Sequence, residues 1–177
     1  MTCVSATRSR SASATIQPND PIPTTLRSGH PIRLNVWAAV GVNHWTAPVI
    51  YEGKMNGDLY DKMIKDHLLP MWPGEGFHYL HDNATFHKTP EVLDRLAVAR
   101  IPLMWNYPPY SPDLNPIEWV WGWLKREVQW YQPQNKQELI NAIKQSWRNM
   151  PQEVLAGFMR HMKTNIIKVI ANNGGTS

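Results

Sequence analysis

One segment, residues 81–126, constrains this chain more than any other: HDNATFHKTPEVLDRLAVARIPLMWNYPPYSPDLNPIEWVWGWLKR. It follows the short apolar run FHYL, which predicts a strand that delivers Asp82 just after its end. Further on, Asn115 as N-cap and Pro116 at the first helical position predict a helix with Glu118 in its first turn. Two carboxylates on different elements can share divalent cations, which clamp the attacking and leaving oxygens of a phosphodiester. The segment therefore indicates metal-dependent phosphoryl transfer on nucleic acid.

Length and composition limit the alternatives. A chain of 177 residues fits one domain and can bury a substantial core. With 42% apolar and only 18% charged residues, it is not expected to be disordered throughout. Its single cysteine, Cys3, excludes an internal disulfide framework and a Cys-based zinc cluster, and indicates a reducing compartment. No apolar run approaches the roughly 20 residues that cross a bilayer, so we expect no membrane partner.

The positive charge lies mainly in the C-terminal part. Residues 31–117 carry seven Lys and Arg against nine Asp and Glu, whereas residues 118–177 carry eight against four. A basic part beside an acid-bearing centre suits a polyanionic partner such as DNA. A solvated helix face would give the same charge pattern, so charge alone leaves both interpretations open.

The order of predicted elements gives the fold class. Residues 1–30 are rich in Ser, Thr, Arg and Pro without apolar periodicity and are expected to form a disordered tail. Strands are expected at 33–41 and 47–53 as a hairpin, at 77–80 and at 101–105. Helices are expected at 57–69, 90–100, 116–128, 136–148 and 151–170, with residues 171–177 frayed. This order predicts a mixed α/β domain, residues 31–170, with a helix-covered sheet.

Both acidic residues also have a structural interpretation. Glu118 at the third helical position could form half of a capping box with Asn115. Asp82 followed by Asn could simply start a turn after the strand. His78, His81 and His87 lie close by in sequence, but their spacing matches no usual zinc pattern, so His81 and His87 are expected to orient ligands or to lie on the surface. A metal site requires the sheet to bring positions 82 and 118 together.

The words HDNATFHK and YSPDLNPIEWVWGWLKR resemble the signature of the Tc/mariner superfamily of cut-and-paste DNA transposases. The upstream text NVWAAVGVNHWTAPVIYEGKMNGDLYDKMIKDHLLP resembles the stretch that precedes the Asp word in that family. The resemblance covers residues 31–128. It implies a ribonuclease-H-like fold with an acidic triad that binds two Mg²⁺ or Mn²⁺ ions, cleaves DNA and transfers the strand. By position, Asp82 is the second acid and Glu118 the third.

The resemblance also implies the roles of neighbouring residues. Lys88, Lys125 and Arg126 are candidates for DNA phosphate contacts. Asn83, His87 and Asn115 are candidates for orienting the ligands. Asp113 is expected to shape the proline-rich loop rather than to bind metal. The implied partners are DNA and a possible second copy of the chain, with no small-molecule substrate, and the implied location is the nucleus.

The chain departs from the family at the first acid, which normally lies on the first strand. Before Glu52 the only acidic residue is Asp20, within QPNDPIP, where the prolines argue against a central strand. We therefore expect the first strand to be missing, the two-metal site to be incomplete and the chain to be inactive alone. Two alternatives stay open: an active nuclease in which Asp20 or a tail residue replaces the acid, and a non-catalytic module that binds DNA or protein.

Overall fold

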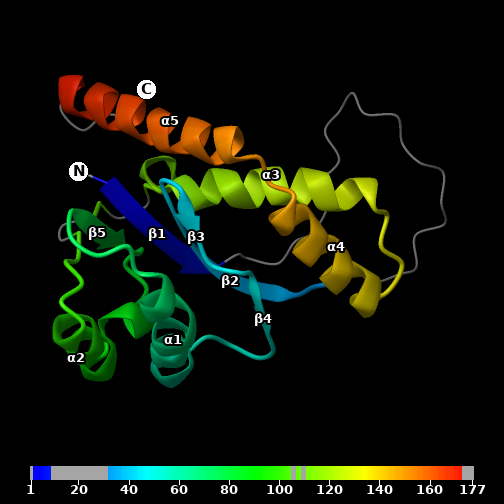
Figure 1. The fold of residues 1–177 in the computed structure, drawn as a ribbon, viewed down its shortest axis with the longest axis horizontal. Coiled ribbons are helices and arrows are strands. Elements are labelled where there is room, and N and C mark those ends of the chain that lie inside the picture. Colours follow the sequence, from blue (N-terminus) through cyan, green and yellow to red (C-terminus); the bar gives the residue numbers. More distant parts are fainter. Residues whose placement is uncertain (1, 9–31, 105–106, 109–110, 173–177) are drawn as a thin grey trace.

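A five-stranded sheet carries helices on both faces (Figure 1). The computed structural model describes residues 2–8, 32–104, 107–108 and 111–172. The strands are β1 (Thr2–Arg8), β2 (Asn35–Gly41), β3 (His44–Trp45), β4 (Val49–Tyr51) and β5 (Phe77–Leu80). The helices are α1 (Gly57–Met63), α2 (Pro90–Val98), α3 (Pro116–Trp130), α4 (Lys136–Arg148) and α5 (Gln152–Ala171). No helix of the described residues is long and apolar enough to cross a membrane.

The centre of the sheet is occupied by β1, and this overturns the expectation that the first strand is missing. The strand order is β3-β2-β1-β5, and β4 also pairs with β2. β1 runs antiparallel to β2, with Val4 opposite Gly41, and parallel to β5, with Ser5 opposite Leu80. The expected tail at residues 1–30 is thus wrong for Thr2–Arg8, whereas residues 9–31 and 173–177 lie outside the described part.

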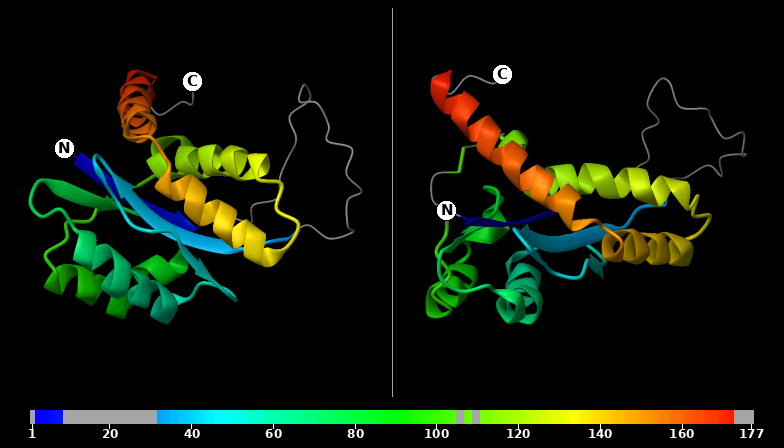
Figure 2. Two further views of the ribbon diagram at one scale, coloured as in Figure 1. Left: turned by 45° about the vertical axis from the view of Figure 1, so that its right-hand side comes forward. Right: turned by 45° about the horizontal axis from the view of Figure 1, so that its top comes forward.

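Two apolar cores form because β2 is buried on both sides. Its side chains alternate between the faces, as the period of a strand requires. Val36, Ala38 and Val40 pack toward α3, α4 and α5, whereas Trp37 and Ala39 pack toward α1 and α2. Figure 2 shows the resulting three layers, with α3, α4 and α5 on one side of the sheet and α1 and α2 on the other.

Most expected elements are present, with two local differences. Helix α1 begins at the Asn56 cap, continues as a π-helix over Ile64–Leu68 and ends in a 3₁₀ turn at Leu69–Met71. The strand expected at 101–105 is reduced to one parallel bridge between Leu103 and Tyr79. Pro102 has no amide hydrogen for a ladder, and two backbone hydrogen bonds join this segment to β5: the Tyr79 amide donates to the Pro102 oxygen, and the Met104 amide donates to the Tyr79 oxygen. Trp105 lies outside the described residues.

Candidate active site around Asp82

Asp82 lies in the turn that follows β5. Its Oδ1 accepts a hydrogen bond from the backbone amide of Ala84 at 3.0 Å. An Asp side chain that bonds the amide two residues on is the expected device for starting a turn. The structural role predicted for Asp82 is therefore present. Its side chain is 43% exposed, so solvent reaches it while the turn limits its motion.

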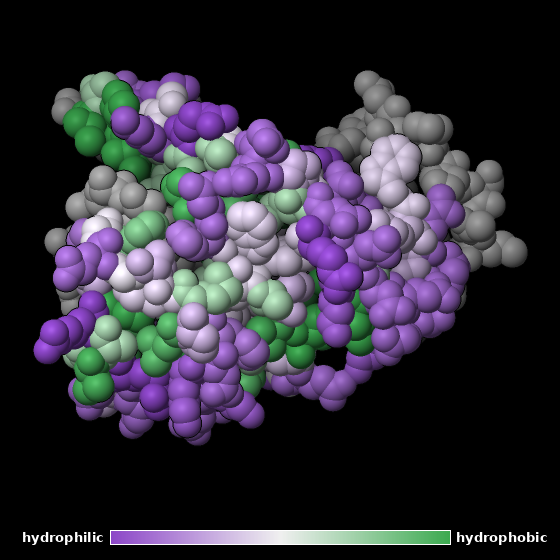
Figure 3. Space-filling view, in the orientation of Figure 1, coloured by the Kyte–Doolittle hydropathy of each residue, from purple (hydrophilic) through white to green (hydrophobic). Residues whose placement is uncertain are grey.

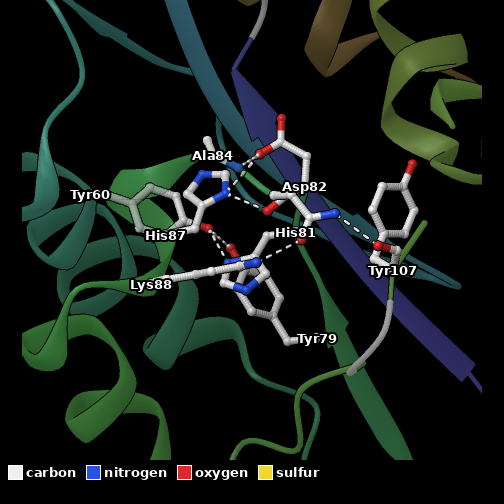
Figure 4. Close-up of polar contacts among 9 residues, drawn as sticks. Tyr60, Tyr79, His81, Asp82, Ala84, His87, Lys88 and Tyr107 are labelled. Carbon is white, nitrogen blue, oxygen red and sulfur yellow. Dashed lines mark hydrogen bonds and ion pairs between the residues drawn. The ribbon is translucent and has the colours of Figure 1, made fainter. Parts of the chain in front are cut away.

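His87 lies beside the same carboxylate and donates to the backbone oxygen of Asp82. His87 lies in the 3₁₀ turn Thr85–Lys88, and its Nδ1 is 2.9 Å from Asp82 Oδ1 and 3.0 Å from the Asp82 backbone oxygen. A backbone oxygen can only accept, so His87 Nδ1 must carry the hydrogen. The His87 side chain is 1% exposed, and its Nε2 is buried without a hydrogen-bond partner among the described residues. The Nδ1–H of His87 is thus directed at Asp82 (Figure 4).

A buried aromatic cluster packs beneath His87. The His81 ring stacks on it with centroids 4.7 Å apart and planes 11° from parallel, and the Tyr60 ring lies 4.1 Å away. The Tyr60 hydroxyl is 2.7 Å from the Tyr79 hydroxyl and 3.3 Å from His81 Nδ1. Burial, and next the neighbouring His87, lower the pKa of His81 to about 3, so its ring is neutral near pH 7. Burial raises the pKa of both Tyr60 and Tyr79.

Asn83 joins the Asp82 turn to its surroundings. Its side-chain amide donates to the Tyr107 backbone oxygen at 2.8 Å, and its Oδ1 accepts from Lys88 Nζ at 2.8 Å. Lys88 is exposed. Of the residues singled out in the sequence, the structure therefore brings together Asp82, Asn83, His87 and Lys88.

Glu118 stands on the first turn of α3 with a partly buried side chain. Asn115 is buried at the N-cap position, and its backbone amide donates to the Pro112 oxygen at 3.1 Å. Its side chain forms no capping hydrogen bond. Trp119, next to Glu118, packs against the small core formed by Leu80 and Met162. The start of α3 and the end of β5 therefore share one core.

The remaining predicted residues lie further along α3 or before it. Lys125 is partly buried and Arg126 is exposed, both beyond the second turn of α3. Asp113 lies in the 3₁₀ turn Pro112–Leu114, and its backbone oxygen accepts from Asn165 of α5 at 3.1 Å. This contact joins the turn to α5 through the backbone, and the role expected for the Asp113 side chain stays a prediction.

The side chains near Asp82 suit a hard cation better than zinc. Carboxylate oxygens are the ligands that Mg²⁺ and Mn²⁺ prefer, and Asp82 carries one such group. In the described ranges no three His, Cys, Asp or Glu side chains lie close enough to hold a metal together. The stacked rings of His81 and His87 are directed to protein partners instead.

The sequence did not single out Tyr60 and Tyr79, although both support the Asp82 turn. A signal was present for Tyr79, because Phe77 and Tyr79 alternate along β5 on the face that packs toward α1, and His81, just after the strand, continues the pattern. Tyr60 comes from α1, 22 positions before Asp82, and no local pattern links the two.

Comparison with known proteins gives the chain its place. Residues 5–140 match the model of the family described as DDE superfamily endonuclease. The transposable element Tc3 transposase of Caenorhabditis elegans is 30% identical over 146 residues, which cover 78% of this chain and 44% of that protein. The Tc1 transposase of the same organism is 30% identical over 101 residues, which cover 57% of this chain and 37% of that protein. The chain thus spans less than half the length of these relatives.

Solved structures show the same fold. The catalytic domain of Mos1 mariner transposase superposes with a TM-score of 0.77 and 13% identity, covering 99% of this chain and 83% of that one. The same domain solved with Raltegravir and Mn superposes with a TM-score of 0.76 and 13% identity, covering 99% of this chain and 84% of that one. The fold is therefore ribonuclease-H-like, as the sequence predicted. The family match extends past residues 31–128 at both ends and begins inside β1. The chain belongs to the DDE superfamily endonuclease family and has the catalytic-domain fold of a Tc/mariner transposase.

Proposed function

We propose that Asp82 and Glu118 are two ligands of a divalent-metal site for DNA strand cleavage that lacks its first acid, and that the chain does not cleave DNA alone. The observation that carries the proposal is the held carboxylate of Asp82, whose Oδ1 accepts from the Ala84 amide and lies 2.9 Å from His87 Nδ1. A backbone amide and a neighbouring buried imidazole thus restrict the position of this carboxylate, as metal sites require of their ligands. The shared packing of Trp119 and Leu80 supports convergence of Glu118 with Asp82.

The oxygen ligands fit Mg²⁺ or Mn²⁺. Mos1 catalytic domain has been solved with Mn and with Mg. When bound, such an ion stabilises negative charge on phosphate and activates an attacking oxygen. In this proposal His87 and Ala84 orient Asp82, whereas Asn83 positions Lys88 toward the incoming phosphate. Asn115 begins the helix that carries Glu118, and Lys125 and Arg126 lie further along it as candidates for phosphate contacts.

The proposed lack of independent activity rests on β1. Its sequence, TCVSATR, contains no Asp or Glu. In the family the first acid lies on this strand, so the metal site here has two acidic ligands in place of three. Fewer ligands weaken ion binding and leave the two-metal arrangement incomplete.

A metal titration followed by thermal melting tests the site. A ligand that binds only the folded state raises the melting midpoint by mass action. We expect Mn²⁺ to raise the midpoint of the unaltered chain and to have little effect on Asp82→Asn and Glu118→Gln. Asp113→Asn is the matched control and should respond like the unaltered chain. An Mn²⁺ shift that survives both site substitutions would refute the proposed ligands.

Incubation with supercoiled plasmid and Mn²⁺ tests activity. We expect no nicking by the unaltered chain. Nicking that both Asp82→Asn and Glu118→Gln abolish would show an active nuclease and contradict the proposed inactivity, with Asp20 or another residue as the first acid.

The second candidate is a non-catalytic module that binds DNA or protein. The observation that favours it is the basic part beyond residue 118, with eight Lys and Arg against four Asp and Glu. Salt-dependent binding to duplex DNA without any Mn²⁺ shift in melting would support it. For either function we propose a nuclear location, where DNA is the partner. We also propose a second copy of the chain as a partner, which sedimentation velocity over a concentration series tests.

A further inference from the structure

A hollow of about 350 Å³ lies between α4 and the segment that joins β3 to β4. Its wall on the strand side is Trp45, Thr46, Ala47 and Pro48, and its wall on the helix side is Lys144, Trp147 and Arg148. It is lined by aromatic, small and basic residues and by no acidic ones. The surface over α4 is strongly hydrophilic in Figure 3.

The floor of the hollow is fixed by hydrogen bonds. Trp147 is buried, and its Nε1 donates to the Thr46 backbone oxygen at 2.8 Å. Thr46 in turn bonds β2, because its amide donates to the Ala39 oxygen and its hydroxyl accepts from the Ala39 amide. The Trp147 ring packs on Trp121 of α3 with centroids 5.7 Å apart. We call this hollow the groove. Its base is already held in place by these contacts, so ligand binding does not need to fix the side chains there.

Contacts also hold both ends of α4 beside the strands. Lys136, the first residue of α4, pairs with Glu52 just after β4. Beyond the other end, the Gln152 side chain donates to Asn43 in the turn between β2 and β3. These two contacts support the placement of α4 beside the strand segment that forms the other wall of the groove.

Two cations at the rim form no ion pair with any residue that the structure describes. Lys144 and Arg148 are exposed and stand one helical turn apart, which sets their Cβ atoms about 5–6 Å from each other. Within the described part of the chain neither forms an ion pair or hydrogen bond with a carboxylate. Lys136, on the same helix, is by contrast neutralised by Glu52. The rim therefore presents two free positive charges beside the half-buried Trp45.

We propose that this groove binds the phosphodiester backbone of DNA at a second site, away from Asp82. Two unpaired cations match neighbouring phosphates, and an aromatic side chain beside a basic groove suits the sugar and base of one strand. This inference rests on the proposed function, because it assumes that DNA is the substrate. It adds a contact that Lys88, Lys125 and Arg126 do not supply.

The position in the sheet makes the two sites distinct. β3 and β4 lie on one outer side of β2, whereas β5, which leads to Asp82, lies beyond β1 at the opposite edge. Three strand spacings separate the edges, about 14 Å. A duplex bound at both places would contact the protein near both edges of the sheet. The groove would therefore orient the DNA and take no part in cleavage.

Fluorescence anisotropy with a labelled duplex tests the site. We compare the unaltered chain with the double variant Lys144→Gln, Arg148→Gln at a series of salt concentrations. The matched control is Lys62→Gln, Lys65→Gln, which removes the same charge from exposed positions on α1 and the adjoining π-helix, across the sheet. Far-UV circular dichroism and the melting midpoint check that each variant is folded.

Loss of two phosphate contacts should weaken binding and lower the slope of log affinity against log salt by about 1.8. The control pair should keep the slope of the unaltered chain. An unchanged slope in the groove variant, or an equal loss in both pairs, would overturn the inference. So would a labelled poly-glutamate peptide that binds as tightly as the duplex and loses equal affinity in the groove variant, because the groove would then be a site for acidic protein.

Failure of this inference can be separated from failure of the proposed function. The Mn²⁺ melting shift of the groove variant reads the Asp82 site and should equal that of the unaltered chain. A chain that binds no duplex at all contradicts both proposals. A chain that binds duplex with equal affinity in the groove variant contradicts the groove alone.

Discussion

At the residue scale, the orientation of Asp82 depends on donors that are themselves held. Ala84 is fixed by the turn, and His87 is fixed by ring contacts with His81 and Tyr60. The Tyr60 hydroxyl is in turn hydrogen-bonded to the Tyr79 hydroxyl, so Tyr79 belongs to the same cluster. A substitution in this cluster should therefore change the orientation of the Asp82 carboxylate, even where the substituted residue does not contact Asp82.

Removal of the His87 donor should weaken metal binding. We expect His87→Ala to raise the apparent Kd for Mn²⁺ by about tenfold or more, because residues that orient metal ligands contribute on that order. His87→Asn, whose amide can donate from a similar position, should recover part of the loss. Melting midpoints across an Mn²⁺ titration give both values. Equal affinities for His87→Ala and the unaltered chain would contradict the role of His87.

Burial of neutral His81 should make stability depend on pH. Its pKa is about 3 when folded and 6.5 as the ordinary value, so the unfolded chain takes up the proton first as pH falls. The stabilisation is complete above pH 6.5 and is lost progressively as pH falls toward 3. Between pH 6.5 and 5 we expect a loss of about 2 kcal/mol in the free energy of unfolding. Urea unfolding in the presence of a chelator measures it.

His81→Gln is the control for this pH dependence. The variant is less stable at pH 7, but its free energy of unfolding should fall less steeply between pH 6.5 and 5. The same slope in both proteins would assign the pH dependence to other groups.

The sequence predicted the contact between Asp82 and its neighbours only in part. Asn83 and His87 belong to the same short word as Asp82, so local spacing was sufficient to select them. Tyr60 reaches the cluster from α1, and its position depends on how α1 packs against the sheet. Tertiary packing of that kind leaves no periodic signal near Asp82.

At the scale of elements, local signals set the limits of prediction. α4 was predicted at its observed bounds because it has a strong start signal: the Asn135 side chain accepts from the Glu138 amide, and the Glu138 carboxylate accepts from Gln134 and Asn135. β5 was predicted equally well from its apolar run. β1 was missed because TCVSATR is flanked by Ser and Arg and finds its partners more than 25 residues away.

The α4 cap gives a stability prediction. Asn135→Ala removes the acceptor for the Glu138 amide and should lower the free energy of unfolding by about 1 kcal/mol. Asn135→Asp keeps an acceptor in place and should be close to the unaltered chain. Chemical denaturation of the three proteins measures the difference. Equal destabilisation by both substitutions would show that the Asn135 amide group, which donates to Glu138, matters more than the cap.

At the scale of the whole molecule, the fold has the first strand that the sequence was expected to lack. The first acid of the triad is still absent from that strand. β1 completes the sheet beside β5, and its parallel register sets Ser5 opposite Leu80. Continued by two residues, this register brings position 7 beside Asp82. The backbone position for a third acid is therefore present and carries Thr7.

Restoration of an acid on β1 tests this view. We expect Thr7→Asp to increase the Mn²⁺ melting shift and to confer plasmid nicking that Asp82→Asn abolishes, because a third carboxylate adds a ligand. Ala6→Asp is the control, since neighbouring positions of a strand face opposite sides of the sheet. A gain in neither variant, or an equal gain in both, would contradict the register argument.

The central place of β1 also determines how the domain unfolds. Among the described strands, β1 alone pairs with both β2 and β5, so the two edges of the sheet are joined through it. Its amide hydrogens should exchange with deuterium only when the whole domain unfolds, whereas those near the exposed Ile167 and Ile170 of α5 should exchange through local fraying. Exchange at Val4 and Ala6 would then report the global free energy of unfolding from the first few residues of the chain.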